Sequence, residues 1–89
     1  MTEIRATERF LNKVSVISSS KLRARLDSLL DLVSEVPTVG STLNREQIRD
    51  EYGESCLTLD LSPFIIVYEH DDDADTVSLY DIIHQRQVR

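Results

Sequence analysis

Apolar residues in the first half of the chain recur at intervals of three and four, which is the spacing of one face of an α-helix. A first apolar stripe consists of Phe10, Leu11, Val14 and Ile17, and a second, longer stripe of Leu22, Leu26, Leu29, Leu30, Val33 and Val36. Three serines separate the stripes, so the pattern predicts two helices joined as a hairpin, whose apolar faces need a sheet to cover them.

Residues typical of helix ends flank both stripes. Thr7 precedes the first stripe, and its hydroxyl can accept a hydrogen bond from an unpaired amide of the first turn. The serines at 18–20 break the first helix and supply caps for the second. Pro37 stops the second helix, and Gly40 permits the turn that follows it.

After residue 53 the apolar period changes to two, which indicates β-strands. Leu57–Leu61 alternates apolar and polar residues and predicts a half-buried strand. Phe64–Tyr68 is apolar on both faces and predicts a central strand. Asp71–Asp75 is typical of a hairpin turn, and Thr76–His84 predicts the last strand.

Two segments have weaker patterns. Thr2–Ala6 predicts a short first strand, whereas Ser41–Gly53 has no clear period and is expected to form either a helical turn at Arg45–Arg49 or a loop. The order of elements predicts an α+β, two-layer fold in a single domain over residues 1–89. It consists of a short N-terminal strand, a helix hairpin and a three-stranded antiparallel meander (β-α-α-β-β-β).

Length and composition exclude several classes of protein. The 89 residues suffice for one small core, and the longest apolar run, Phe64–Tyr68, is far shorter than the roughly 20 residues of a membrane span. Met1–Arg5 lacks the pattern of a signal peptide. Cys56 is the one cysteine and cannot form an internal disulfide, which suits a reducing compartment. We therefore expect a cytoplasmic protein, and we exclude membrane proteins, disulfide-stapled secreted domains, zinc fingers and multidomain enzymes.

Charge is distributed unevenly along the chain. Residues 1–49 carry eight basic and six acidic side chains, a balance of +2, whereas residues 50–89 carry two basic and ten acidic ones, a balance of −8. An acidic half repels a nucleic-acid backbone and suits a basic partner, so we expect no direct DNA binding. The alternative interpretation is a solvated acidic face that only improves solubility.

An aspartate run near the end of the chain resembles the start of a calcium-binding loop. Asp71, Asp73 and Asp75 have the spacing of the first three ligands, but such a loop requires glycine at its sixth position and glutamate at its twelfth. Those positions hold Thr76 and Ile82. A solvated hairpin turn is the favoured interpretation, and no metal or cofactor is expected.

The strongest chemical candidates lie at the end of the last predicted strand. His84 can act as an acid or a base near neutral pH, and the guanidinium groups of Arg86 and Arg89 can bind a phosphate, although a basic end of a chain also arises by chance. Tyr68 is either a core-edge residue with its hydroxyl in water or a stacking and proton-transfer group. Cys56 has no nearby histidine, which favours a buried packing residue over a nucleophile.

The order and spacing of five segments carry a family resemblance. These segments are Glu3–Arg5 with Glu8–Leu11, Leu29-Leu30 with Val36-Pro37 and Gly40, Pro63–Tyr68, Asp72–Val77 and Ile82–Gln87. They resemble the first strand and opening helix, the second helix and its closing turn, the Tyr-Arg-Ile-x-Tyr strand, the acidic hairpin and the closing Ile-Leu-His-x-Arg of one family. That family is the RelE/ParE toxin superfamily of bacterial type II toxin–antitoxin (plasmid stabilisation) systems.

The resemblance implies a toxin of one of two kinds and a protein that neutralises it. RelE-like members are ribosome-dependent endoribonucleases that cut messenger RNA with lysine, arginine and tyrosine side chains, whereas ParE-like members poison DNA gyrase. In both kinds a cognate antitoxin covers the helix hairpin and the sheet. Phe10, Arg23, Arg86 and Arg89 are therefore candidates for contact with an antitoxin or a target, and a homodimer is an open possibility.

Departures from the nuclease pattern favour the ParE-like kind. Ile65 replaces the arginine three places before the strand tyrosine, and Asp81 stands where many relatives have an arginine in the last strand. Ser55–Leu61 contains no lysine or arginine, and the sequence reaches Arg89 without a late tyrosine. Because a pentavalent phosphorane needs preorganised positive charge, these losses weigh against RNA cleavage.

The resemblance and the departures from it imply three alternative functions. The first is a ParE-like toxin, not itself an enzyme, that inhibits a cytosolic protein target, with DNA gyrase as the candidate. The second is a RelE-like messenger-RNA endoribonuclease acting at the ribosome, with His84, Arg86 and Tyr68 as its catalytic candidates. The third is a non-toxic, degenerate binding module on the same fold, whose acidic face engages a basic protein.

Overall fold

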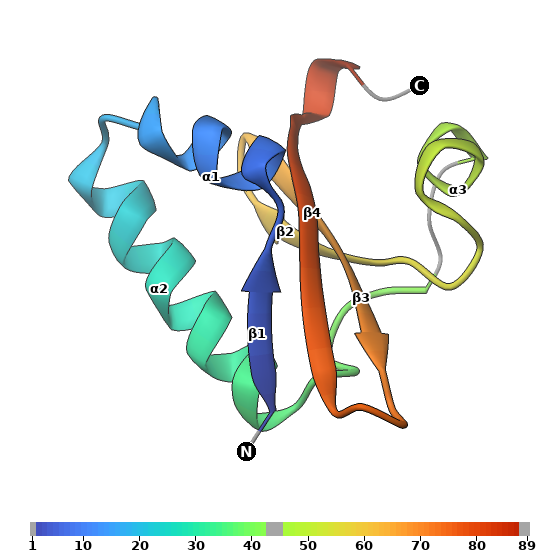
Figure 1. Ribbon diagram of the computed structural model, residues 1–89. Coiled ribbons are helices and arrows are strands. Elements are labelled where there is room, and N and C mark those ends of the chain that lie inside the picture. Colours follow the sequence, from blue (N-terminus) through green and yellow to red (C-terminus); the bar gives the residue numbers. More distant parts are fainter. Residues whose placement is uncertain (1, 43–45, 88–89) are drawn as a thin grey trace.

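A helix hairpin covers one face of a four-stranded sheet in the computed structural model, which describes residues 2–42 and 46–87 (Figure 1). The elements in chain order are β1 (Glu3–Ala6), α1 (Glu8–Ser15), α2 (Ser20–Glu35), α3 (Glu46–Tyr52), β2 (Leu57–Leu61), β3 (Phe64–Asp71), β4 (Thr76–His84) and a final 3₁₀ turn at Gln85–Gln87. The predicted α+β class and the β-α-α-β-β-β order are confirmed, with α3 added between the hairpin and β2.

The sheet is mixed, with the strand order β1-β4-β3-β2. The strands β2, β3 and β4 form the predicted antiparallel meander. β1 lies parallel to β4, and their register runs from Glu3 opposite Thr76 to Ala6 opposite Leu79. β3 pairs with one side of β4 and β1 pairs with the other side, so the first strand of the chain is an edge strand of the sheet.

Both predicted helix caps are present. The Thr7 side-chain oxygen accepts a hydrogen bond from the Phe10 amide at 3.1 Å and donates one to the Tyr80 carbonyl at 2.8 Å, which ties the start of α1 to β4. The Ser19 hydroxyl accepts from the Leu22 amide at 3.3 Å at the start of α2. These bonds satisfy amides that a helix leaves unpaired in its first turn.

The main core lies between the hairpin and the sheet. Its buried members are Phe10, Ile17, Leu26 and Val33 from the hairpin side and Leu57, Leu61, Ile66, Tyr68, Val77, Leu79 and Ile82 from the sheet. Two members of the predicted stripes lie outside this core, because Leu11 is 56% exposed and Val36 is 47% exposed. Leu11 follows Phe10 by one residue and is rotated away from the sheet by about 100°, and Val36 lies beyond the last residue of α2.

A second, smaller core occupies the opposite face of the sheet, under α3 (Figure 1). Ile48 and Tyr52 of α3 pack there against a cluster from the sheet side: Cys56, Ile65, Val67 and Ile83. The sequence predicted a helical turn at Arg45–Arg49 or a loop, whereas the helix covers Glu46–Tyr52 and Arg45 lies outside the described residues. Cys56 is fully buried, which confirms its predicted packing role.

The strands β3 and β4 change register once. Val67 lies opposite Asp81 and Tyr68 lies opposite Leu79, so Tyr80 is an extra residue in β4 with no residue opposite it. Such a bulge disturbs the alternation of side chains between the two faces. Beyond it, β3 continues to Asp71, three residues past its predicted end at Tyr68.

Candidate functional site

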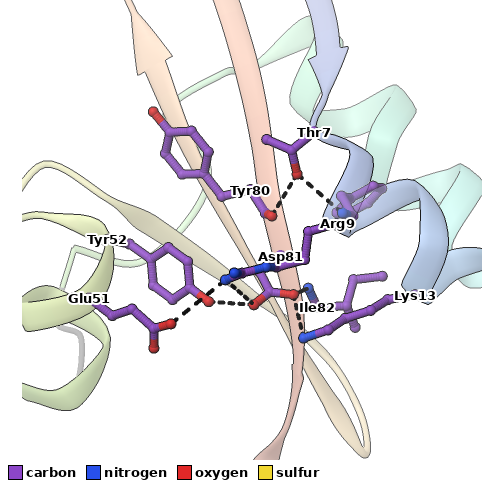
Figure 2. A network of polar contacts seen from close by, with 9 residues as sticks. Thr7, Arg9, Lys13, Glu51, Tyr52, Tyr80, Asp81 and Ile82 are labelled. Atoms are coloured by element: carbon purple, nitrogen blue, oxygen red, sulfur yellow. Dashed lines mark hydrogen bonds and ion pairs between the residues drawn. The ribbon is translucent and has the colours of Figure 1, made fainter.

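A buried carboxylate joins three elements at the bulge of β4. Asp81 is 2% exposed, and its Oδ1 atom lies 2.6 Å from Lys13 Nζ of α1 and accepts the Ile82 amide at 2.8 Å. The Tyr52 hydroxyl of α3 donates to Asp81 Oδ2 (Figure 2). The bulge explains this position, because it breaks the alternation of side chains and Asp81 meets groups from both α1 and α3.

Arg9 extends this network on the side of α1. Its Nη1 atom lies 3.8 Å from Glu51 Oε1 and 3.9 Å from Asp81 Oδ2 (Figure 2). The two cations, Arg9 and Lys13, therefore face two carboxylates, Glu51 and Asp81, and the formal charges of these four groups cancel. A network with balanced charge supplies no surplus positive charge for a phosphate, and we assign it a structural role in joining α1, β4 and α3.

The environment of Tyr52 makes its hydroxyl a permanent hydrogen-bond donor. Burial first, and then the hydrogen bond to the Asp81 carboxylate and the negative charges of Asp81 and Glu51, raise the pKa of Tyr52 well above its ordinary value. The hydroxyl therefore stays protonated over the physiological range and cannot act there as a general base. Burial also raises the pKa of Tyr68, and burial together with Glu69 raises that of Tyr80.

These shifts predict that alkali destabilises the fold. Because each tyrosine has a higher pKa when folded than the value of about 10 expected when unfolded, the unfolded chain releases its phenolic protons first. This contribution to stability is complete below about pH 10 and is lost as the pH rises above it. Urea unfolding at a series of pH values should show a falling free energy of unfolding above about pH 10. The slope should be shallower in Tyr52→Phe, and equal slopes in both proteins would contradict the assignment.

The structure brings together two of the three predicted catalytic residues. His84 ends β4, and its ring packs edge-on against Phe64 with centroids 5.5 Å apart. Its Nδ1 atom accepts the Arg86 amide at 3.1 Å, and Arg86 is exposed in the final 3₁₀ turn. Tyr68 lies four residues from Phe64 along β3, a separation of roughly 13 Å, so it does not share a site with this pair.

The environment of Tyr68 differs from both predictions, a core-edge residue with its hydroxyl in water and a stacking or proton-transfer group. Its ring is fully buried in the main core, and its hydroxyl donates to the Pro37 carbonyl at 2.9 Å and accepts the Gly40 amide at 2.8 Å. The hydroxyl is therefore shielded from water and is already bonded to the backbone on both sides. It holds the turn after α2 against the sheet.

The predicted contact residues occupy different environments. Phe10 is 2% exposed and belongs to the main core, so its ring is not on the surface of the described structure. Arg23 lies on the surface, where its Nε atom donates to the Ile17 carbonyl at 2.7 Å and its Nη2 atom to the Val14 carbonyl at 3.2 Å. These bonds satisfy carbonyls at the end of α1. Arg86 is exposed, and Arg89 lies outside the described residues.

A mainly apolar groove of about 470 Å³ lies beside the turn between α1 and α2. Residues from both helices and the turn between them, from the start of β3, and from the end of β4 and the final 3₁₀ turn line it: Lys13, Val16, Ile17, Ser18, Ser19, Leu22, Phe64, Ile82, His84 and Gln87. Val16 is 78% exposed at its rim. Sequence reasoning singled out His84 for its chemistry and missed the groove, because Phe64 comes to this turn only through the sheet.

The aspartate run forms the predicted hairpin turn. Asp71 Oδ1 accepts the amides of Asp73 at 3.0 Å and Ala74 at 3.2 Å, and Asp75 adopts a positive φ of 48°. Asp71 therefore caps the backbone of the turn.

Within residues 2–42 and 46–87, no group of three or more histidine, cysteine, aspartate or glutamate side chains is arranged to hold a metal ion. No helix in those same ranges has the length and apolar character needed to cross a membrane.

Comparisons with known proteins give a family from the sequence and a shared fold from solved structures. A family model described as the ParE toxin of the type II toxin–antitoxin system parDE matches residues 3–89. The isolated E. coli RelE toxin superposes with a TM-score of 0.73 at 19% identity, over 94% of this chain and 84% of that one. A chain of the intact E. coli RelBE toxin–antitoxin complex superposes with a TM-score of 0.70 at 22% identity, over 94% and 96%. No curated protein matches the sequence significantly.

Proposed function

This chain belongs to the ParE toxin family of type II toxin–antitoxin systems, and from that premise we propose that it inhibits a protein target, with DNA gyrase as the first to test, and that a cognate antitoxin neutralises it. The resemblance to RelE at about a fifth identity concerns the fold. The choice between a protein target and messenger RNA therefore depends on the side chains of this chain.

The observation that carries the proposal is the apolar lining of the sheet face under α3, whose strands β2, β3 and β4 contain no arginine or lysine side chains. Ile65 and Asp81, the two positions where the family resemblance leads one to expect arginine in many nuclease-like members, both lie on this face. Ile65 packs in the apolar cluster with Ile48, and Asp81 binds the Tyr52 hydroxyl. β2 contributes no lysine or arginine. A face covered by a helix and lined by apolar groups does not offer the preorganised positive charge that phosphodiester cleavage needs.

The remaining cations nearby do not replace the missing ones. Lys13 and Arg9 are held by the carboxylates of Asp81 and Glu51, so a phosphate would have to compete with both. Arg86 is exposed beside His84, but one arginine supplies a small part of what a ribosome-bound RNA, with its many phosphates, requires. These facts support a protein target over an RNA substrate.

The groove beside the turn between α1 and α2 is the surface that we assign to the antitoxin. It is mainly apolar and open, and exposed Val16 stands at its rim. An amphipathic segment could place apolar side chains against Val16, Phe64 and Ile82 there. The structure of a RelBE complex from E. coli, which shares the fold, is of a toxin with its antitoxin.

Induced expression in a bacterial host tests the proposed target. Following the uptake of labelled precursors, we expect DNA synthesis to stop before RNA and protein synthesis, and we expect the purified protein to alter gyrase supercoiling at micromolar concentration. Co-expression of the cognate antitoxin should restore growth. In a translating extract, transcript cleavage should be the same with Arg86→Ala as with the unchanged protein, because the proposal gives the Arg86 side chain no catalytic role.

Two other outcomes would replace the proposal. If protein synthesis stops first and Arg86→Ala abolishes transcript cleavage, the chain is a messenger-RNA endoribonuclease despite its neutral sheet face. If no synthesis stops and gyrase is unaffected, the chain is a non-toxic binding module on the same fold.

A further inference from the structure

Two tyrosine rings form an aromatic surface beside the Asp81 network. Tyr52 comes from the last position of α3, and Tyr80 is the extra residue of the β4 bulge. Their ring centroids lie 6.4 Å apart with planes inclined by 13°, and Figure 2 shows the two rings next to one another. Both residues are partly exposed. We call this pair the tyrosine platform.

A shallow pocket of about 290 Å³ lies at the platform, lined by Thr7, Arg9, Glu51, Tyr52 and Tyr80. The network described above uses the hydroxyl of Tyr52, and Tyr80 donates its hydroxyl to Glu69 Oε2 at 3.1 Å. These hydrogen bonds fix the edges of both rings. The ring faces, which carry the negative part of the aromatic quadrupole, take no part in them.

The charges around the platform favour a cation. The charges of the Asp81 network cancel, because Arg9 and Lys13 face Glu51 and Asp81. Glu69, which accepts the Tyr80 hydroxyl on the other side of the platform, adds one further negative charge, so the balance of these five groups is −1. The half of the chain that contains both tyrosines carries a balance of −8. A ligand that brings phosphate groups would meet this field with repulsion, whereas a cationic side chain would meet it with attraction.

We propose that the tyrosine platform binds the guanidinium group of an arginine side chain of a partner protein. A guanidinium is planar and weakly hydrated, so it can stack on a tyrosine face while its N–H groups reach carboxylates at the rim. Glu51 lines the pocket, and Glu69 is bonded to Tyr80. A lysine ammonium has the charge without the plane and should bind less well.

Arg9 lies at the edge of the same pocket and shows that the carboxylates there can hold a guanidinium group. Its guanidinium stands between Glu51 and Asp81, at 3.8 Å and 3.9 Å. Because those carboxylates neutralise it, Arg9 leaves the approach to Tyr80 without a net positive barrier. The proposal goes beyond the choice of toxin target, since a basic segment of an antitoxin or of another protein could supply the arginine.

Titration of the full chain with blocked tripeptides tests the proposal. The probes are Gly-Arg-Gly, Gly-Lys-Gly and guanosine monophosphate, and the readout is the shift of the tyrosine ring resonances in NMR spectra. We expect the arginine peptide to bind with a dissociation constant of about 1–10 mM, and the lysine peptide to bind at least about threefold more weakly. The mononucleotide should bind more weakly than either.

Matched variants separate stacking from general attraction. Tyr80→Phe keeps the ring and should keep the affinity within about twofold, whereas Tyr80→Leu removes the ring and should weaken binding at least about fivefold. Glu51→Gln removes the charge of an exposed side chain whose ion pair with Arg9 is long, at 3.8 Å, and it should weaken the binding of the arginine peptide by about two- to threefold.

Three results would overturn the proposal. The first is equal binding of the arginine and lysine peptides with no effect of Tyr80→Leu, since charge alone would then explain the attraction. The second is a mononucleotide that binds more tightly than the arginine peptide, which would make the platform a nucleobase site. The third is the absence of any shift at the tyrosine rings, with shifts elsewhere or none at all.

Discussion

Asp81→Ala is expected to lower the free energy of unfolding by about 2–3 kcal/mol, as measured by urea unfolding followed by circular dichroism. The substitution removes a buried carboxylate that accepts from the Tyr52 hydroxyl and the Ile82 amide and lies 2.6 Å from Lys13 Nζ. Its loss leaves the hydroxyl and the amide without their acceptor. Because Lys13 is partly exposed, its ammonium turns to water, and the loss stays below that of a fully buried ion pair.

An exposed ion pair provides the control. Arg5 Nε lies 3.2 Å from Glu3 Oε1, and both side chains are mostly in water. Glu3→Gln should therefore cost less than about 0.5 kcal/mol. If Asp81→Ala cost no more than this control, the network around Asp81 would not hold α3 to the sheet, and the assigned structural role would be wrong.

Gly40→Ala should destabilise the fold by about 2–3 kcal/mol, because the added methyl group has no room. A Cβ atom at this position would lie 2.7 Å from the Tyr68 hydroxyl oxygen, 2.8 Å from its Cε1 atom and 3.0 Å from Leu57 Cβ. The Tyr68 ring cannot yield easily, since it is fully buried and its hydroxyl is bonded to Pro37 and to Gly40 itself.

Gly53→Ala separates steric overlap from backbone strain. Gly53 has a φ of +98°, but an added Cβ atom would meet nothing within 4 Å, so the expected cost is the conformational one of about 1 kcal/mol. Tyr68→Phe removes the nearest of the three crowding atoms, the hydroxyl oxygen, so Gly40→Ala in that background should cost about 1 kcal/mol less than in the natural chain. Additive costs would show that the contact with the hydroxyl does not cause the loss.

The helix hairpin and the meander could be predicted because each rests on a local pattern. The stripes from Phe10 and Leu22 have helical spacing, and the run from Leu57 alternates. The parallel position of β1 beside β4 could not be predicted in the same way. Pairing between Ile4 and Val77 joins residues more than seventy positions apart, and periodicity carries no information about which sheet edge a strand takes.

The Asp81 network lay beyond sequence reasoning for a similar reason. An aspartate between Tyr80 and Ile82 is an anomaly that the sequence does display, since a buried carboxylate needs partners. Those partners, Lys13 and Tyr52, come from helices far away in the chain. The helix that carries Tyr52 offered only two apolar residues on one face, Ile48 and Tyr52, which is too few to distinguish a short helix from a loop.

Tyr68 illustrates an error of a different kind. Its residue type suited both a core edge and a proton-transfer group, and neither interpretation considered a hydroxyl bonded to the backbone of a distant turn. A tyrosine that ends an apolar run in a central strand has little access to water. The apolar neighbours in Phe64–Tyr68 were therefore a better guide to its environment than its chemistry.

Because β1 pairs with β4, the sheet cannot be completed until the C-terminal part of the chain has been synthesised. β1 is made first, yet it has a neighbour in the sheet only after β4, the last strand, has left the ribosome. A chain interrupted by a stop codon before Thr76 would leave both β1 and β3 without the strand that lies between them. We therefore expect unfinished copies to be unfolded and harmless to the cell that makes them.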